Sequence, residues 1–417
     1  MVSNADSTTH RLWIRFISGV AVVALLIGGS LTLSDVQSAN PATSTSTTVT
    51  PRPALSLETI AFSSPTNGFG VFTEETLSGR TCRDFVGHSA DGGAYFGSLV
   101  HAMSWNCYKN EFSSSLALDG HGDAFLYGPW LYVSHDNAKS WTRSPQPGAV
   151  LDVAAVGHSV WTIESICTHV EKVSLERCPV RLLESINGGR TWEQSRTVPP
   201  HLITGLLSDG ANDQTYLVRT SRSAAYLMLA PLPNSHGATR VIPLWYTSNG
   251  GHTWSNRPVP CGIGALSAVL SAAPDGTLMA ICAGQPSAGE QGKSVLESTN
   301  GGRTWVTKNR CLAPGTPSCS TSNIDFGYLG GIDLVTSSEA FIVGGRSSLQ
   351  VTHDGGSRWQ VVQPLIGGSA GGTGQVVFFD ASHGVVLGQN DNNNEDSTLW
   401  STVDGGKHWT ALLPRIG

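Results

Sequence analysis

One eight-residue pattern recurs along the chain and constrains its fold more than any other feature. It reads Ser/Thr, any residue, Asp/Asn, Gly, Gly, any two residues, and Trp. The copy at 134–141 lacks both glycines, and the copy at 89–96 ends in Phe. The closing aromatics, 45 to 62 residues apart, are Phe96, Trp141, Trp192, Trp254, Trp305, Trp359 and Trp409. A period near 50 residues is typical of repeat folds in which each unit is one blade.

The local chemistry of this motif predicts a structural role. Asp-Gly or Asn-Gly between short β-type segments indicates a hairpin, because the turn residues need positive φ. The Asp/Asn side chain can accept hydrogen bonds from the turn's backbone N–H groups, and the aromatic can bury a large apolar surface between units. The predicted structural residues are Asp91, Asp136, Asn187, Asn249, Asn300, Asp354 and Asp404, with Trp141, Trp192, Trp254, Trp305, Trp359 and Trp409.

The seven copies resemble the Asp-box (BNR) repeat of β-propellers, over roughly residues 55–413. Bacterial sialidases and xyloglucan-active glycoside hydrolases carry this repeat. The segments Glu58–Phe72 and Val376–Leu387 look most like the photosystem II assembly/stability factor family. The resemblance implies an all-β, seven-bladed β-propeller with four-stranded antiparallel blades. It also implies an assembly or binding role at a membrane, although one fold hosts many unrelated activities.

The N-terminal region differs from the repeats. Arg11 and Arg15 precede Phe16–Ser34, a stretch without charged residues that is long enough to span a bilayer. The positive residues before it predict a cytoplasmic N-terminus and an extracytoplasmic propeller at the cell membrane; a cleaved signal peptide and a secreted protein are the alternative. The expected parts are a cytoplasmic N-terminus (1–15), a transmembrane anchor (16–34), a Ser/Thr/Pro-rich linker (35–54) and the propeller (55–417).

Eight cysteines support the same compartment, because an even cysteine count outside the cytoplasm indicates disulfides. The expected blade map favours sequential pairs. We predict the bridges Cys82–Cys107, Cys167–Cys178, Cys261–Cys282 and Cys311–Cys319. We expect no metal and no cofactor, and the segment Asp119–Asp123 predicts a tight turn between two strands.

Long insertions indicate which face binds a ligand. In an antiparallel blade the first turn and the motif lie on one face, so the remaining connections lie on the other. The long insertions predicted there are 73–84, 97–115, 167–178, 221–240, 283–293, 306–323 and 389–396. Function in repeat folds tends to lie where loops vary. Our candidate binding residues on this face are Tyr108, Lys109, Arg177, Arg219 and Arg346.

The composition narrows the function classes. The net charge is −6 and no basic block is present, which argues against a nucleic-acid partner. We predict a monomeric, non-catalytic scaffold that binds a protein or a glycan, and we assign no catalytic residue. The alternative is an exo-acting glycoside hydrolase of sialidase type, which needs three arginines around a carboxylate. Other glycosidases need two nearby carboxylates, for which the candidates are Asp84, Glu164, Asp325 and Asp333.

Overall fold

The described part of the protein is an all-β unit within Arg52–Gly417. The computed structural model describes residues 55–76, 81–106, 114–145, 148–165, 180–194, 215–229, 243–262, 264–284, 286, 290–312, 317–362, 366, 372–389 and 398–417. No helix among these residues is long and apolar enough to cross a membrane. The predicted anchor and linker lie outside the described residues.

Seven four-stranded antiparallel sheets follow one another along the chain. Blade 1 contains β1 (Leu55–Ser64), β2 (Asn67–Glu75), β3 (Cys82–Ser89) and β5 (Val100–Trp105). Blade 2 contains β6 (Ser115–Leu118), β7 (Ala124–Tyr127), β8 (Tyr132–Ser134) and β9 (Thr142–Arg143). Blade 3 contains β10 (Ala149–Val156), β11 (Ser159–Ser165), β12 (Val180–Ser185) and β13 (Glu193–Gln194).

The remaining blades repeat this order. Blade 4 contains β14 (Thr215–Arg219), β15 (Ala225–Leu229), β16 (Leu244–Thr247) and β17 (Ser255–Arg257). Blade 5 contains β18 (Ser267–Ala272), β19 (Leu278–Ala283), β20 (Lys293–Ser298) and β21 (Val306–Cys311), followed by α1 (Pro317–Ser322). Blade 6 contains β22 (Gly331–Leu334), β23 (Ala340–Val343), β24 (Gln350–Thr352) and β25 (Gln360–Val361). Blade 7 contains β26 (Gly372–Phe378), β27 (Gly384–Gln389), β28 (Thr398–Thr402) and β29 (Thr410–Leu412).

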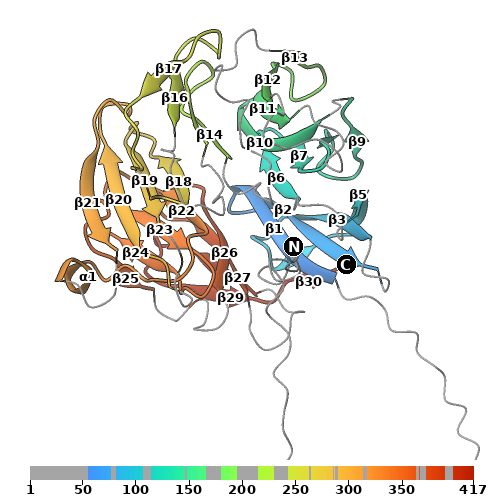
Figure 1. Ribbon diagram of the computed structural model, residues 1–417. Coiled ribbons are helices and arrows are strands. Elements are labelled where there is room, and N and C mark those ends of the chain that lie inside the picture. The colour runs from blue at the N-terminus through green and yellow to red at the C-terminus, as the bar shows by residue number, and fades with distance from the viewer. Residues whose placement is uncertain are drawn as a thin grey trace, which may run out of the picture. The chain divides into compact units, whose positions relative to one another are not determined.

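The blades form a closed ring, with the first strand of each nearest the axis (Figure 1). Each innermost strand contacts its neighbours, and β26 contacts β1 across the seam between the last and first blades. The outermost strands β9 and β25 are two residues long and exposed, which limits edge-to-edge pairing. The prediction of a seven-bladed propeller is therefore confirmed.

The apolar core is divided among the blade interfaces. Seven buried clusters are present in the described residues, one between each pair of neighbouring blades. The aromatic of each motif lies in the cluster shared with the preceding blade; Trp359, for example, packs with Val295 of blade 5. The aromatics thus join each blade to the one before it.

All seven motif copies fold into one turn between the third and fourth strands. In each, the Ser/Thr hydroxyl donates to the Asp/Asn Oδ1 and accepts the N–H of the residue four positions on, at 2.8–3.1 Å. Oδ1 also accepts an N–H four residues after itself, at 2.9–3.0 Å. The side chains therefore satisfy the turn's backbone donors, as the sequence predicted.

Two features favour glycine at the second glycine position of the motif. Gly356 has φ +91°, and a Cβ there would lie 2.6 Å from Cγ1 of Val295 in the preceding blade. The incomplete copy in blade 2 keeps the same backbone without glycine, because Asn137 and Ala138 adopt φ +57° and +61°. Asn enters this left-handed region readily, whereas Ala does so at a cost of about 1–2 kcal/mol.

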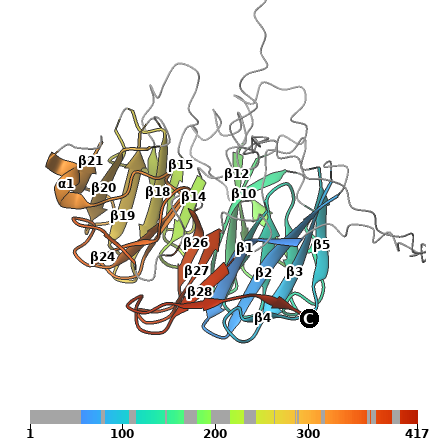
Figure 2. The same ribbon diagram turned by 90° about the horizontal axis from the view of Figure 1, so that it is seen from below.

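A short parallel pair connects the end of the chain to its first motif. The strand β30 (Arg415–Ile416) pairs with β4 (Tyr95–Phe96), which lies inside the motif turn of blade 1. Figure 2 shows β4 and the C-terminus together at one edge of the blades. We call this edge the motif face, because β4 belongs to a motif, and the opposite edge the loop face.

Candidate ligand-binding site

A cavity lies at the loop face, where the innermost strands begin. Its volume is about 330 Å³. Five blades contribute to its lining, and Ser115 and Thr215 are the first residues of β6 and β14. The lining residues are Ser115, Tyr127, Gly128, Val150, Leu151, Asp152, Thr215, Tyr216, Gly330 and Gly374. The cavity therefore occupies the axial end of the ring on the face where the sequence places the long insertions.

Asp152 is the acidic group among these lining residues. Its carboxylate accepts hydrogen bonds from the N–H groups of Leu217 (2.7 Å) and Val153 (2.8 Å) and from the hydroxyl of Tyr127 (3.3 Å). Burial raises the pKa of Asp152 to about 7, and these three hydrogen bonds oppose the rise. Burial, followed by the adjacent carboxylate, raises the pKa of Tyr127 well above its usual value. Close to neutral pH, the cavity wall thus holds a neutral phenol beside a carboxyl that is partly protonated.

The hydrogen bonds of Asp152 also have a structural role. Leu217 belongs to the innermost strand of the next blade, so the carboxylate joins two blades. Asp333 of blade 6 bonds in the same way to the N–H of Phe378 in blade 7, at 2.6 Å. Burial raises the pKa of Asp333 to about 6. Gln375 of blade 7 accepts the N–H of Ile60 in blade 1, at 2.8 Å.

Two other acids suggested by the sequence hold connections at the loop face. Asp84 is buried and accepts hydrogen bonds from Thr73, from Trp105 and from Ser114, which precedes β6. Glu164 is buried and pairs with Arg181 at 2.8 Å. These side chains are occupied in anchoring the chain between blades, and neither lines the cavity.

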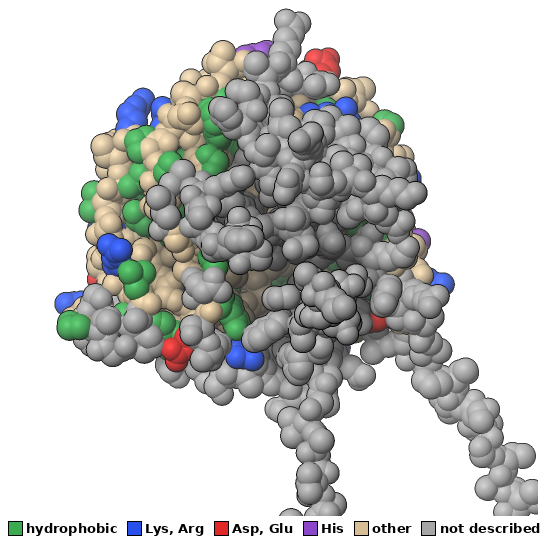
Figure 3. Space-filling view, in the orientation of Figure 1, with side chains coloured by type: hydrophobic (Ala, Val, Ile, Leu, Met, Phe, Trp, Pro, Cys, Tyr) green, Lys and Arg blue, Asp and Glu red, His purple; other side chains and the backbone are tan. Residues whose placement is uncertain are grey.

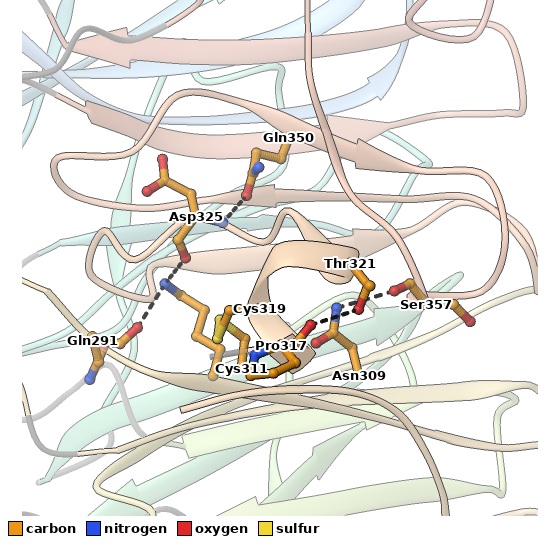
Figure 4. The surroundings of a disulfide bond; sticks show 10 residues. Gln291, Asn309, Cys311, Pro317, Cys319, Thr321, Asp325, Gln350 and Ser357 are labelled. Carbon is orange, nitrogen blue, oxygen red and sulfur yellow. Dashed lines mark hydrogen bonds between the residues drawn. A yellow bond between two sulfur atoms is a disulfide. The ribbon is translucent and has the colours of Figure 1, made fainter. Parts of the chain in front are cut away.

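Between blades 5 and 6 a buried lysine plays the anchoring role, and Figure 4 shows its surroundings, with Gln291, Asp325 and Gln350 labelled. Lys293 is 2% exposed and donates to the backbone carbonyls of Gln291, Asp325 and Gly327. Burial lowers its pKa to about 8. Asp325 receives a further anchor from Gln350, whose side-chain oxygen accepts its N–H at 2.8 Å. The loop-face connection between these blades is therefore fixed by buried polar contacts.

Two of the predicted disulfides strengthen the same region. Cys261–Cys282 joins the segment before β18 to the end of β19, with Cα atoms 5.5 Å apart. Cys311–Cys319 joins the end of β21 to α1, with Cα atoms 4.6 Å apart. Both pairs are confirmed. Cys82 is disulfide-bonded as well, whereas the other predicted members, Cys107, Cys167 and Cys178, lie outside the described residues.

The predicted binding residues have different outcomes. Arg346 follows β23 at the loop face, exposed, with its guanidinium carbon 5.8 Å from the ring centre of Tyr328. Arg219 is a correction, because it ends β14 at the motif face. There it donates to the Ser159 carbonyl (2.6 Å), and its guanidinium lies over the Trp161 ring. The other three predicted residues, Tyr108, Lys109 and Arg177, lie outside the described residues.

The placement of Arg219 corrects one predicted insertion. Residues 220–224 form the turn between β14 and β15 at the motif face, so the insertion assigned to 221–240 begins too early. Burial lowers the pKa of Arg219 to about 10. Sequence reasoning also missed Asp152, although a carboxyl within the apolar run Ala149–Val153 was a signal that could have identified it.

Charged side chains among the described residues do not gather in one patch on the face shown in Figure 3. In Figure 3 the described Lys, Arg, Asp and Glu side chains are scattered along the rim. The described cavity lining likewise contains no Lys or Arg. The chemistry offered by the cavity is therefore that of hydroxyls, phenols, backbone amides and one carboxyl.

Comparisons with known proteins find only distant similarity. No protein-family model and no curated protein matches the chain. Solved structures similar to it include YCF48 from Cyanidioschyzon merolae, at 15% identity and a TM-score of 0.45 over 73% of this chain and 85% of that one. A GH74 xyloglucanase from Xanthomonas campestris has 13% identity and a TM-score of 0.46, over 86% of this chain and 67% of that one. A PL25 ulvan lyase has 9% identity and a TM-score of 0.47, over 88% and 95%. Similarity at this level says nothing about ligand or activity, and the class defined by the fold is a seven-bladed β-propeller.

Proposed function

We propose that the protein is a non-catalytic scaffold that binds a protein segment or a glycan at the loop face. One observation carries this proposal: the loop-face cavity presents two tyrosines, two hydroxyls and one carboxyl. Aromatic rings with convergent polar groups are typical of binding pockets for uncharged polar ligands. A single carboxyl that already accepts three hydrogen bonds is poorly suited to two-carboxylate glycoside hydrolysis.

The sialidase alternative fits the described residues less well. It requires arginines around a ligand carboxylate, whereas the described lining carries a carboxyl and no Arg. Arg219, one of the arginines considered from sequence, is at the motif face and bonded to Ser159. A negatively charged sugar would be repelled by ionised Asp152.

The test compares binding with turnover. The purified protein is applied to an array of neutral glycans, sialylated glycans and peptides, and the bound probes are offered to wild type and to Tyr216→Ala. We expect neutral glycans or peptides to bind, Tyr216→Ala to weaken this binding at least about tenfold, and fluorogenic sialosides and neutral glycosides to remain uncleaved.

The matched control is Tyr95→Ala, because Tyr95 is 43% exposed at the motif face. It should bind the same probes as wild type does. Equal loss in the two variants would mean that the cavity is not the site. Cleavage of any glycoside by wild type, abolished in Asp152→Asn, would replace the scaffold with an enzyme.

We also propose that the propeller lies outside the cytoplasm on a membrane tether. The disulfides Cys261–Cys282 and Cys311–Cys319 support this compartment, because such bonds persist in oxidising environments. Protease added to intact cells should release a soluble propeller by cutting in the linker at 35–54. Protection of the propeller until the cells are lysed would contradict this orientation.

A further inference from the structure

A second cluster of functional groups lies at the motif face between blades 2 and 3. It contains Asp119 and Asp123, which bracket the β6–β7 turn, and His158 from the β10–β11 turn. Their ligand atoms all lie within 4.8 Å of one another. The two aspartates are only 5% and 4% exposed, whereas the His158 side chain is 52% exposed. Two buried carboxylates thus face a histidine that opens to solvent.

From this arrangement we propose that Asp119, Asp123 and His158 bind a divalent metal ion of the zinc class. Nδ1 of His158 lies 2.9 Å from Oδ2 of Asp119 and 3.7 Å from Oδ2 of Asp123. In a tetrahedral zinc site with bonds of about 2.0–2.1 Å, neighbouring ligand atoms are about 3.3 Å apart. The two observed separations lie on either side of this value, so small shifts of the side chains would bring both to the tetrahedral distance. Imidazole with carboxylate suits zinc, whereas calcium takes six to eight oxygens.

Outer contacts already orient each ligand. Oδ1 of Asp119 accepts the N–H groups of His121 (2.7 Å) and Asp123 (3.1 Å), which leaves Oδ2 directed at His158. Oδ1 of Asp123 pairs with Nδ1 of His135 at 2.9 Å. The ring of His158 lies 4.7 Å from that of His121, centre to centre. Contacts of this kind, made by residues behind the ligands, hold metal ligands in their binding orientation.

The charges around the cluster are compatible with a cation. Two buried carboxylates need compensation, and Arg190 supplies one positive charge by donating to Oδ2 of Asp123 at 3.3 Å. A carboxylate oxygen has two lone pairs, so Oδ2 can accept from Arg190 and still bind an ion. With imidazole as a neutral ligand, the two carboxylates and Arg190 leave one negative charge, which a divalent ion more than compensates.

Comparison among the repeats separates this cluster from the ordinary motif face. Blade 6 has the equivalent of the His135–Asp123 pair: His353 at the second motif position lies 3.2 Å from Glu339, just before β23. No second acid or second histidine joins that pair among the described metal-ligating groups. Blade 2 alone among the described first turns carries acids at both ends, Asp119 and Asp123. The blade 6 pair is therefore a natural control.

The experiment measures metal binding by the full chain, purified with its disulfides oxidised and stripped with a chelator. Zinc chloride is titrated in competition with a chromophoric chelator, and Co²⁺ is added separately to read the ligand field from its visible absorption. We expect one ion per chain. We also expect the affinity to fall about 100-fold or more in His158→Ala and about tenfold in His135→Ala, because His135 orients Asp123 without binding the ion itself.

The control variant His353→Ala should bind zinc as wild type does. His158→Ala loses a hydrogen bond to Asp119, so its denaturant midpoint in the absence of metal is measured to show that the variant is folded, and His158→Asp should restore part of the affinity. Zinc bound equally by wild type and His158→Ala, or weakened equally by His353→Ala, would overturn the proposal. The site is independent of the ligand proposed for the loop face, so failure of one does not decide the other.

Discussion

The two faces of the propeller differ in how their turns and connections are held in place. On the motif face, seven turns repeat one hydrogen-bond pattern within a spread of a few tenths of an ångström. On the loop face, three described connections are anchored by different side chains, Asp84 in blade 1, Glu164 in blade 3 and Lys293 in blade 5. Repetition therefore marks what the fold requires, and a departure from repetition points to function. The Asp119–His158 cluster is such a departure on the repetitive face.

Removing a buried motif aromatic tests the structural role of the motif and should change stability the most. Trp359 is fully buried between blades 5 and 6, so Trp359→Ala should lower the free energy of unfolding by about 3–5 kcal/mol. Trp305 is only partly buried, and Trp305→Ala should cost about half as much. Denaturant unfolding under oxidising conditions measures both. Equal losses would show that the motif aromatics do not act through burial.

Disulfide removal perturbs the loop face instead. Replacing Cys261 and Cys282 by Ala should cost about 2–4 kcal/mol, because the bond closes a 21-residue separation. Replacing Cys311 and Cys319, which are 8 residues apart, should cost about 1 kcal/mol less. Unfolding curves of the two double variants provide the measurement, and the reverse order would contradict the chain-entropy account.

The pH dependence of stability tests the acids that join blades. The pKa values of Asp152 and Asp333 are raised to about 7 and about 6, above the unfolded value, so the folded state holds these protons more tightly. Their contribution to stability is complete below about pH 4 and is lost as the pH rises to about 7. Both groups are partly solvated, so the loss should be about 1–2 kcal/mol. Unfolding of Asp152→Asn and Asp333→Asn at pH 5 and pH 8 should show a smaller difference than wild type; an unchanged difference would assign the effect elsewhere.

The smallest effect concerns the incomplete motif of blade 2. Ala138→Gly removes left-handed strain at φ +61° but also removes a methyl group that is 3% exposed in the core. These contributions are of similar size, so the change in unfolding free energy should stay below about 1 kcal/mol. A loss above about 2 kcal/mol would show that the methyl group packs more tightly than its neighbours indicate.

The sequence alone predicted the blades, because each motif turn is formed by residues that are close together in the sequence. Each turn is defined by neighbouring residues such as Thr352, Asp354 and Gly356, and the spacing of the copies follows from four strands per blade. The two confirmed disulfide pairs, Cys261–Cys282 and Cys311–Cys319, also followed from this map. Arg219 was misplaced because its turn, residues 220–224, contains no Gly, Pro, Asn or Asp to indicate it.

The candidate sites depend on contacts that no local pattern contains. His158 meets Asp119 from 39 residues away, because first turns of consecutive blades lie side by side at the motif face. The cavity combines residues from five blades, so its composition becomes visible only when the ring is assembled. Asp152 and Asp333 look alike in sequence, and only the structure shows that both join neighbouring blades while Asp152 also faces the cavity.

The pairing of β30 with β4 places residues 415–417 at the motif face, opposite the cavity. Because the C-terminal Gly417 lies at the motif face, with its N–H bonded to the Phe96 carbonyl, a tag attached there points away from the loop face. A chip or bead that captures the protein through such a tag would hold every copy with its cavity toward the bulk solution. Captured in this orientation, an array of copies could engage a multivalent ligand with avidity rather than one site at a time.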